Sequence, residues 1–161
     1  MTEQELRHQI VQLARSLFMR GYSSGSAGNI SVRLEDRLLV TPTNSCLGRL
    51  EPARISKLAP DGSHISGDKP TKEAFLHTTM YDHRPETGAV VHLHSTHSVA
   101  VSCLSGIDRH NCLPPITAYY AMRIGRLPLV PYYPPGDTAL AAADNYRPVG
   151  QIRVVSLLDR C

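Results

Sequence analysis

The sequence predicts an α/β fold, or an α+β fold in which helices flank one sheet, and three observations indicate this class. The chain has 161 residues, enough for one domain, so we expect a single domain over residues 1–161. An amphipathic helical pattern opens the chain, and an alternating pattern typical of a β-hairpin follows it. Helical and strand patterns then alternate along the remaining sequence, as they do in proteins of this class.

The first expected element is a helix over residues 2–20. Its apolar side chains recur every three to four positions, at Leu6, Ile10, Leu13, Ala14, Leu17 and Phe18. Thr2 and Glu5 can form a capping box at the start of this helix, and Gly21 can end it.

A hairpin is expected after this helix. Residues 30–34 alternate between apolar and polar side chains, and residues 38–41 follow across a charged turn. A loop rich in Thr, Pro, Asn and Gly is expected over residues 42–52, and Asp61-Gly62 marks a further turn.

The second half of the chain carries both helical and strand patterns. The expected helices cover residues 71–83 and 95–104, with a short one starting near Pro134, and the expected strands cover residues 88–94, 127–130 and 154–158.

Composition and charge exclude several classes of protein. Hydrophobic residues make up 42% and charged residues 19%, which excludes disorder as the main state. No apolar run approaches the roughly 20 residues of a membrane span and no leader pattern opens the chain, so we expect a cytoplasmic protein without a membrane partner. The net charge of +3 is distributed along the chain without a basic cluster, which argues against nucleic acid as a binding partner. It leaves positively charged side chains available to bind a small anionic substrate. The four cysteines are widely spaced and are expected to be reduced, buried thiols.

Two histidines form a candidate metal site. His92 and His94 share one face of the expected strand because successive side chains alternate. Two residues span roughly 6.5 Å, so the imidazoles can converge on one ion at about 2.0–2.1 Å from each nitrogen. A pair of hydrogen-bonded histidines at a strand end is the alternative. His97 lies past the strand and is expected to stand behind the ligands or at the surface.

A carboxylate and two turns add to this candidate site. Glu73 falls at an expected helix start, where the helix dipole favours a negative charge and free N–H groups suit phosphate. Thr71 adds a hydroxyl group there, and Lys72 adds a positive charge. Residues 25–31 and 41–45 form turns of small and hydroxyl side chains, and each of them alone is an ordinary turn.

Together these segments resemble the class II aldolase and adducin family, which L-fuculose phosphate aldolase typifies. The matching motifs occur in family order and spacing up to about residue 140, and they are Gly25-Ser26-Ala27-Gly28-Asn29-Ile30-Ser31, Thr41-Pro42-Thr43, Glu73 and His92-Leu93-His94. The resemblance implies a mostly antiparallel central sheet flanked by helices in three layers. It also implies a homotetramer with sites between subunits.

The resemblance also implies roles for individual residues. His92 and His94 would bind Zn²⁺, and Glu73 would be the catalytic acid/base and can complete the ligand set. Tyr119 stands near the position of the family's tyrosine acid, with packing in the core or at an interface as the alternative. Substrate phosphate would contact polar residues of the Gly-Asn loop, of the Thr-Pro-Thr turn and of the segment just before Glu73, and Lys72 would lie nearby. These residues are Ser26, Asn29, Thr43, Asn44 and Thr71.

Three runs, residues 41–48, 66–73 and 128–133, resemble the branch of this family that decarboxylates 3-oxo-tetronate 4-phosphates. Sugar-phosphate aldolases commonly carry Ser before the glutamate, whereas this chain carries Lys72, whose charge can hold a substrate carboxylate. The implied reaction is loss of CO₂ through a metal-bound enediolate that Glu73 protonates to give dihydroxyacetone phosphate. An aldolase or epimerase on a phosphorylated sugar forms a similar intermediate and stays open as an alternative.

The C-terminal tail departs from the family pattern. The resemblance implies a third zinc histidine in an Asn-His-Gly turn, whereas no histidine follows His110. Residues 145–161 do not resemble the family, so we expect a chain that is truncated or altered at its end. Two histidines hold zinc weakly, so the alternatives include an inactive family member or a non-catalytic domain such as the head of adducin.

Overall fold

A computed structural model of the chain describes residues 1–134 and 137–142. The chain divides into two compact units, Met1–Leu93 and His94–Cys161, and each is described by itself. The first unit contains the sheet and most of the polar side chains of the candidate site.

The first unit is built on one five-stranded antiparallel sheet, which confirms the predicted class. The strand order is β4-β3-β2-β1-β5, and every neighbouring pair is antiparallel. The strands are β1 (Asn29–Leu34), β2 (Arg37–Val40), β3 (Ser56–Leu58), β4 (His64–Ser66) and β5 (Ala89–His92). The sequence patterns predicted β1, β2 and β5 but missed β3 and β4, because strands of three residues are too short to show alternation.

Helix α1 (Glu3–Met19) confirms the predicted first helix. Its capping box forms as expected, since the Thr2 N–H donates to Glu5 Oε2 at 2.7 Å and the Glu5 N–H donates to Thr2 Oγ1 at 3.3 Å. Gly21 follows the helix at a φ of 77°, a conformation that favours glycine.

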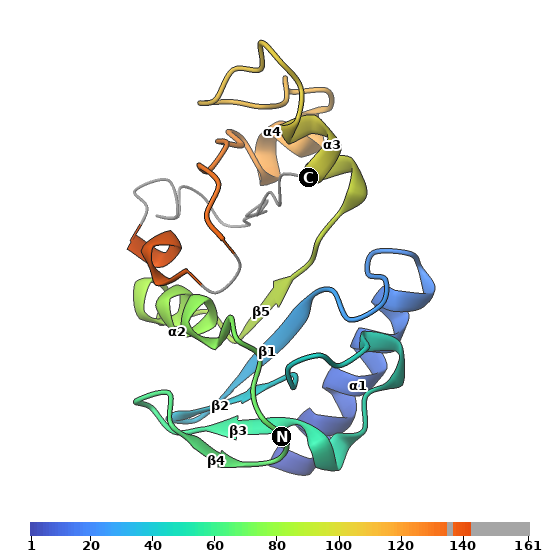
Figure 1. Cartoon of the computed structure of the whole chain (residues 1–161), viewed down its shortest axis with the longest axis vertical. Helices are drawn as coiled ribbons and strands as arrows, with labels where there is room; N and C mark the ends of the chain where they lie inside the picture. Colours follow the sequence, from blue (N-terminus) through green and yellow to red (C-terminus); the bar gives the residue numbers. More distant parts are fainter. Residues whose placement is uncertain (135–136, 143–161) are drawn as a thin grey trace. The chain divides into compact units, whose positions relative to one another are not determined.

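Helices α1 and α2 (Ala74–His83) cover opposite faces of the sheet, so this unit has three layers (Figure 1). Alternation along β2 decides which residue faces which helix. Leu39 packs in a buried cluster with Leu6 and Ile10 of α1. On the other face Leu38, Val40 and Leu58 pack with Tyr81 of α2.

Helix α2 begins at Ala74, three residues later than predicted. The backbone before the helix pairs with residues 41 and 42, because the Thr71 N–H donates to the Thr41 carbonyl at 3.2 Å and Pro70 forms an antiparallel bridge with Pro42. Glu73 therefore stands at the N-cap position instead of within the first turn, and its side chain makes no capping hydrogen bond. The predicted loop over residues 42–52 also contains structure, namely the 3₁₀ turns η1 (Leu47–Arg49) and η2 (Pro52–Arg54).

The second unit contains short helices. They are α3 (Thr96–Ser102), which the sequence predicted, α4 (Ala118–Arg123), which it did not, and the 3₁₀ helix η3 (Thr138–Ala142). The expected strand over residues 127–130 is wrong. The Cys112 N–H donates to the Leu127 carbonyl and the Leu129 N–H donates to the Arg109 carbonyl, both at 2.8 Å. The Leu127 N–H, however, donates to the side-chain oxygen of Asn111 at 3.2 Å and not to a backbone carbonyl, so no regular ladder forms. The expected strand over residues 154–158 and the tail 145–161 lie outside the described residues.

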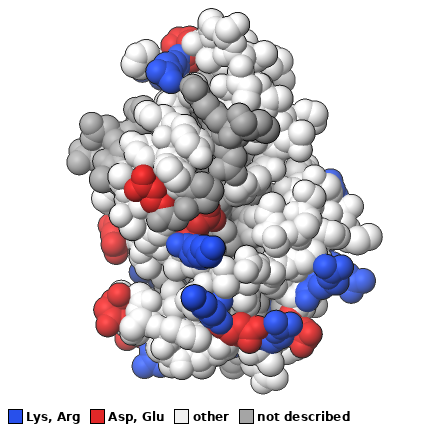
Figure 2. Space-filling view, in the orientation of Figure 1, with Lys and Arg blue, Asp and Glu red and all other residues white. Residues whose placement is uncertain are grey.

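Surface properties agree in part with the composition. Basic and acidic side chains lie among one another on the face shown in Figure 2. Within residues 1–134 and 137–142, no helix combines the length and the apolar character that crossing a membrane requires.

Cys46, Cys103 and Cys112 are free thiols, but Cys103 is exposed and the other two are half-buried, so the expectation of buried thiols is wrong for all three. Cys161 lies outside the described residues.

Candidate metal and substrate site

Two rows of polar side chains meet between the sheet and α2. On β1, Asn29 and Ser31 share one face, separated by about 6.6 Å for two residues of a strand. On α2 and its N-cap, Glu73, His77 and Tyr81 recur every four residues, which is about 6 Å along a helix. Because the two spacings nearly match, side chains of one row lie between those of the other.

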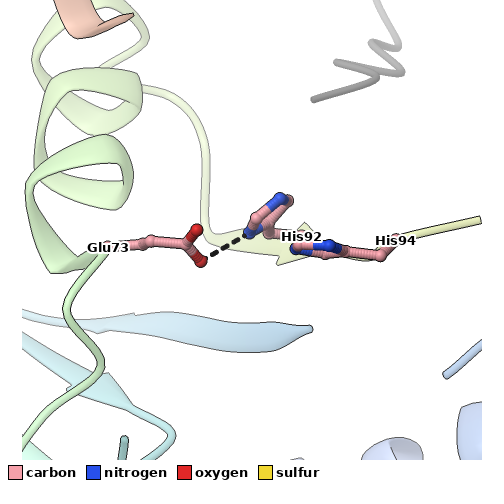
Figure 3. Close-up of side chains that lie close together, drawn as sticks. All are labelled: Glu73, His92 and His94. Carbon is pink, nitrogen blue, oxygen red and sulfur yellow. Dashed lines mark ion pairs between the residues drawn. The ribbon is translucent and has the colours of Figure 1, made fainter. Parts of the chain in front are cut away.

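Glu73, His92 and His94 form a group that fits a divalent metal ion (Figure 3). One ligand atom from each residue lies within 4.8 Å of the others, and Glu73 Oε2 is 3.0 Å from His92 Nδ1. Ligands of a tetrahedral zinc ion stand about 3.3 Å apart, given bonds of about 2.0–2.1 Å, so small side-chain movements would complete such a site. Two histidines and a glutamate with an open fourth position are typical of catalytic zinc.

The strand expected over residues 88–94 ends at His92, so it carries His92 but not His94. His92 is the last residue of β5 and pairs with Asn29 across the sheet, so it lies on the α2 face. Leu93 packs on the α1 side, against the buried cluster of Ala14 and Ile30. His94, at which the second unit begins, returns to the side of His92.

Gly28 explains why the Gly-Asn motif is needed beside this strand. A Cβ atom at Gly28 would lie 3.0 Å from the His92 carbonyl oxygen and 3.1 Å from the side chain of Leu93, and the φ of Gly28 is +83°. Glycine therefore lets the loop approach β5 closely and start β1 with Asn29 opposite His92.

Behind Glu73 lies a network of hydrogen bonds that the sequence analysis missed. Asn29 Nδ2 donates to Glu73 Oε2 at 2.6 Å, and Asn29 Oδ1 is bonded to His77 Nε2. Ser31 Oγ lies 2.7 Å from His77 Nδ1 and 2.9 Å from the Tyr81 hydroxyl group. The only sequence signal was the polar Ser31 on the strand predicted over residues 30–34, with Asn29 directly before it, and it did not identify a partner.

Burial fixes the protonation states in this network. His77 is 1% exposed, and desolvation, with a smaller contribution from His92, lowers its pKa to about 3, so its imidazole is neutral near neutral pH. Burial likewise raises the pKa of Tyr81 to about 12, so its hydroxyl group keeps its proton.

The residues predicted to bind phosphate fall into two sets. Ser26, Thr43 and Asn44 line one pocket of about 430 Å³, together with Arg49 and Arg54, which the sequence analysis did not single out. Arg54 also pairs with Asp68 at 2.7 Å.

The other three candidates have different surroundings. Asn29 is 5% exposed and its amide is bonded to Glu73 and His77. Thr71 is 9% exposed and its hydroxyl oxygen accepts the Glu73 N–H at 3.3 Å, whereas Lys72 is exposed. The phosphate roles of all six residues stay predictions.

Besides His94, two candidates lie in the second unit. Tyr119 is on α4 and is 69% exposed. Its role as an acid stays a prediction. His97 is exposed at the start of α3, which agrees with a surface position.

Comparisons with known proteins agree with this architecture. The family profile described as "Class II Aldolase and Adducin N-terminal domain" matches residues 8–157, which include parts of both units. A 3-oxo-tetronate 4-phosphate decarboxylase from Escherichia coli (strain K12) is 54% identical over 150 residues, covering 89% of this chain and 71% of the relative. An L-fuculose phosphate aldolase from Methanocaldococcus jannaschii is 37% identical over 136 residues, covering 84% of this chain and 71% of the relative.

Solved structures show the same fold. The crystal structure of YgbL from Escherichia coli, described as a candidate aldolase/epimerase/decarboxylase, superposes with a TM-score of 0.82 at 53% identity, covering 87% of this chain and 68% of that one. An L-fuculose 1-phosphate aldolase superposes with a TM-score of 0.76 at 21% identity, covering 86% of this chain and 64% of that one, and this likeness concerns the fold alone.

Proposed function

The chain belongs to the class II aldolase and adducin family, and from that premise we propose that it decarboxylates a 3-oxo-tetronate 4-phosphate to dihydroxyacetone phosphate and CO₂. Decarboxylases and aldolases among its relatives make it an enzyme of the carbon–carbon lyase class. The observation that carries the proposal is the Glu73 carboxylate beside His92, with the cation of Lys72 directly before it in the chain.

The proposed metal is Zn²⁺, held by His92, His94 and Glu73. A bound zinc ion supplies a Lewis acid that stabilises negative charge developing on substrate oxygens. Support for this metal comes from the donor set, because two imidazole nitrogens and one carboxylate oxygen are ligands that zinc prefers.

Glu73 is the proposed acid. Loss of CO₂ breaks the bond between the carboxylate carbon and C2 of the substrate, and the electron pair left at C2 is shared with the neighbouring ketone oxygen. C2 must then gain a proton. The Glu73 carboxylate, which is ionised in the resting protein and would leave the metal to act, takes up a proton from water and donates it to C2. The side chain of Glu73 is 17% exposed and receives a hydrogen bond from Asn29, so it is held in place while still accessible to substrate.

Two further groups would bind the ends of the substrate. The pocket that contains Ser26, Thr43 and Asn44 offers hydroxyl and amide donors to the phosphate, and Arg49 and Arg54 add positive charge to its lining. Lys72 would hold the substrate carboxylate, which a neutral sugar phosphate lacks.

The proposal also includes features that come from family resemblance: assembly as a homotetramer, a cytoplasmic location and Tyr119 as an acid. Mass measurement by light scattering tests the assembly. Tyr119→Phe, compared with wild type in the same assay, tests the tyrosine.

The second candidate function is aldol cleavage of a phosphorylated sugar, and it is supported by the similarity to an L-fuculose phosphate aldolase at 37% identity. Assays with the two substrates distinguish it from decarboxylation. The zinc-loaded protein is assayed separately with a 3-oxo-tetronate 4-phosphate and with L-fuculose 1-phosphate, while CO₂ and dihydroxyacetone phosphate are measured. We expect both products from the acid in equal amounts. Dihydroxyacetone phosphate from the sugar, without CO₂ from the acid, would instead support the aldolase.

A variant of Lys72 tests the recognition of the acid. Lys72→Ser removes a charged hydrogen bond and should lower kcat/KM for the acid about tenfold to a hundredfold. Lys69→Ser, at another exposed lysine three residues earlier, is the matched control and should leave kcat/KM unchanged. Equal effects of the two variants would remove Lys72 from substrate binding.

A further inference from the structure

Four buried side chains connect Glu73 to the interior of the first unit, and we call them the buried polar chain: Asn29, Ser31, His77 and Tyr81. Each is at most 5% exposed, and hydrogen bonds link Asn29 to His77, His77 to Ser31, and Ser31 to Tyr81. The proposed reaction as described above uses none of their protons. Burying a polar group costs free energy unless it is hydrogen-bonded, and each of these four groups is.

The direction of every hydrogen bond in the buried polar chain follows from its end at Glu73. An ionised carboxylate only accepts, so the Asn29 amide must present its nitrogen to Glu73 and its oxygen to His77. The oxygen is an acceptor, so His77 Nε2 must carry the proton. The neutral imidazole then has an accepting Nδ1, to which Ser31 must donate, and the Ser31 oxygen in turn accepts from Tyr81.

Each donor therefore points toward Glu73, from the Tyr81 hydroxyl group through Ser31, His77 and Asn29. The states of both titratable members agree with this direction, since His77 is neutral and Tyr81 keeps its proton. Tyr81 is itself held, because Arg33 lies 4.7 Å above its ring and donates to its carbonyl oxygen at 3.2 Å.

The buried polar chain cannot serve as a proton wire. An amide nitrogen does not release its proton at ordinary pH, so Asn29 interrupts any transfer between His77 and Glu73. Such a chain can instead orient the Asn29 amide relative to Glu73. If the His77 tautomer were reversed, the Asn29 amide would rotate and turn its oxygen toward the Glu73 carboxylate, and the two acceptors would repel each other.

We propose that His77 is a positioning residue for Glu73: its Nε2–H fixes the Asn29 amide so that Asn29 Nδ2 holds Glu73 Oε2 beside His92, while Ser31 and Tyr81 fix the His77 tautomer. This inference rests on the proposed function, because it takes Glu73 as the acid. The residues lie on β1 and α2, which are regular elements and hold a site more firmly than loops do.

The tautomer is tested first, on the metal-free and substrate-free wild-type protein. Nitrogen NMR of protein labelled with ¹⁵N in its histidines distinguishes Nε2–H, Nδ1–H and charged imidazoles, and the His77→Gln variant assigns the signal. We expect a neutral Nε2–H tautomer that stays unchanged from about pH 5 to 8. An Nδ1–H tautomer or a charged ring would overturn the inference.

Variants of His77 test the positioning. His77→Leu removes the donor, whereas His77→Gln places an amide N–H near the position of Nε2 and should keep the bond to Asn29. We expect His77→Leu to lower kcat and zinc affinity about tenfold to a hundredfold, as loss of groups that orient ligands does, with KM little changed. His77→Gln should restore most of both quantities.

Two controls separate positioning from a loss of folding. His83→Leu changes an exposed histidine of the same helix and should leave kcat and zinc affinity unchanged. Tm is measured for every variant, because a merely structural role predicts that kcat falls only as Tm falls and that Gln does not rescue it. Wild-type kcat and zinc affinity in a folded His77→Leu protein would overturn the inference. If wild type fails to decarboxylate, the proposed function fails alone, because the tautomer and the zinc affinity are read without substrate.

Discussion

The two faces of the sheet are stabilised in different ways, although the same strands form both. The face under α1 is apolar, with its buried side chains contributed by helix, strands and loop: Leu6, Ile10, Ala14, Ile30, Leu39, Leu47 and Ile55. The face under α2 is apolar along β2 and β3, and Val90 of β5 packs against the same cluster. Along β1 and β5 it carries Asn29, Ser31 and His92, which face Glu73, His77 and Tyr81.

This difference shows how one strand serves two purposes. On β1, Ile30 points to the apolar face while its neighbours Asn29 and Ser31 point to the polar one. Apolar packing is non-directional and depends mainly on volume, whereas buried polar groups depend on each partner being present and correctly oriented. We therefore expect changes on the α1 face to affect stability, and changes on the polar face to affect chemistry as well.

The largest expected effect is on the polar face, at Glu73. Glu73→Gln keeps the size of the side chain but removes its carboxyl proton, so kcat should fall by a factor of roughly 10²–10⁴. Binding of dihydroxyacetone phosphate, measured by calorimetry, should stay as in wild type because the phosphate pocket is unchanged. The control is Glu86→Gln at an exposed glutamate. Near-normal turnover would remove Glu73 from the chemistry.

The next effect concerns the metal. His92→Ala removes one of three ligands and should weaken zinc binding more than about tenfold, measured as metal content per chain after dialysis. The exposed His97, five residues later, provides the control His97→Ala. A zinc content equal to that of wild type in a protein that lacks both His92 and His94 would contradict the metal site.

The apolar face should respond in stability alone. Leu39 is fully buried, so Leu39→Ala should lower the free energy of unfolding by about 2–5 kcal/mol while kcat of the folded protein stays unchanged. Leu13→Ala, at a leucine of α1 that is 63% exposed, should have little effect on either quantity. Urea unfolding and the decarboxylase assay measure the two quantities. A parallel loss of kcat in Leu39→Ala would end the contrast between the faces.

The last expected effect, which is the smallest when expressed per pH unit, is an acid sensitivity of the polar face. His77 has a pKa of about 3 in the folded protein against 6.5 for an ordinary histidine, so between these values the unfolded chain binds one more proton. Stability contributed at this site should therefore fall as the pH drops from 6.5 towards 3, by up to about 1.4 kcal/mol per pH unit.

Unfolding free energies measured over this pH range test the acid sensitivity. His77→Gln should show a shallower decline with falling pH than wild type, and His8→Gln, at an exposed histidine of α1, is the control. Identical slopes for His77→Gln and wild type would mean that His77 does not stay neutral in the fold.

The sequence by itself determined the features that depend on neighbouring residues. The period of α1, the Thr2–Glu5 capping box and the alternation of the hairpin are local, so each was predicted and found. The spacing of His92 and His94 is equally local, and with Glu73 it identified the possible metal-binding group. The motifs that carry the family resemblance are short contiguous runs, and the family is the one that the sequence profile matches.

The tertiary structure alone decided the features that depend on distant partners. Helix α2 starts late because Thr71 is bonded to Thr41, and residues 127–130 form no strand because the Leu127 N–H is bonded to the side chain of Asn111. The bonds from Ser31 to His77 and Tyr81 join residues that are 46 and 50 positions apart. A buried polar side chain needs a partner, but periodicity cannot identify that partner, because the contact depends on how a helix is aligned with a strand. His77 therefore looked like an ordinary helical residue until the fold brought Asn29 to its ring.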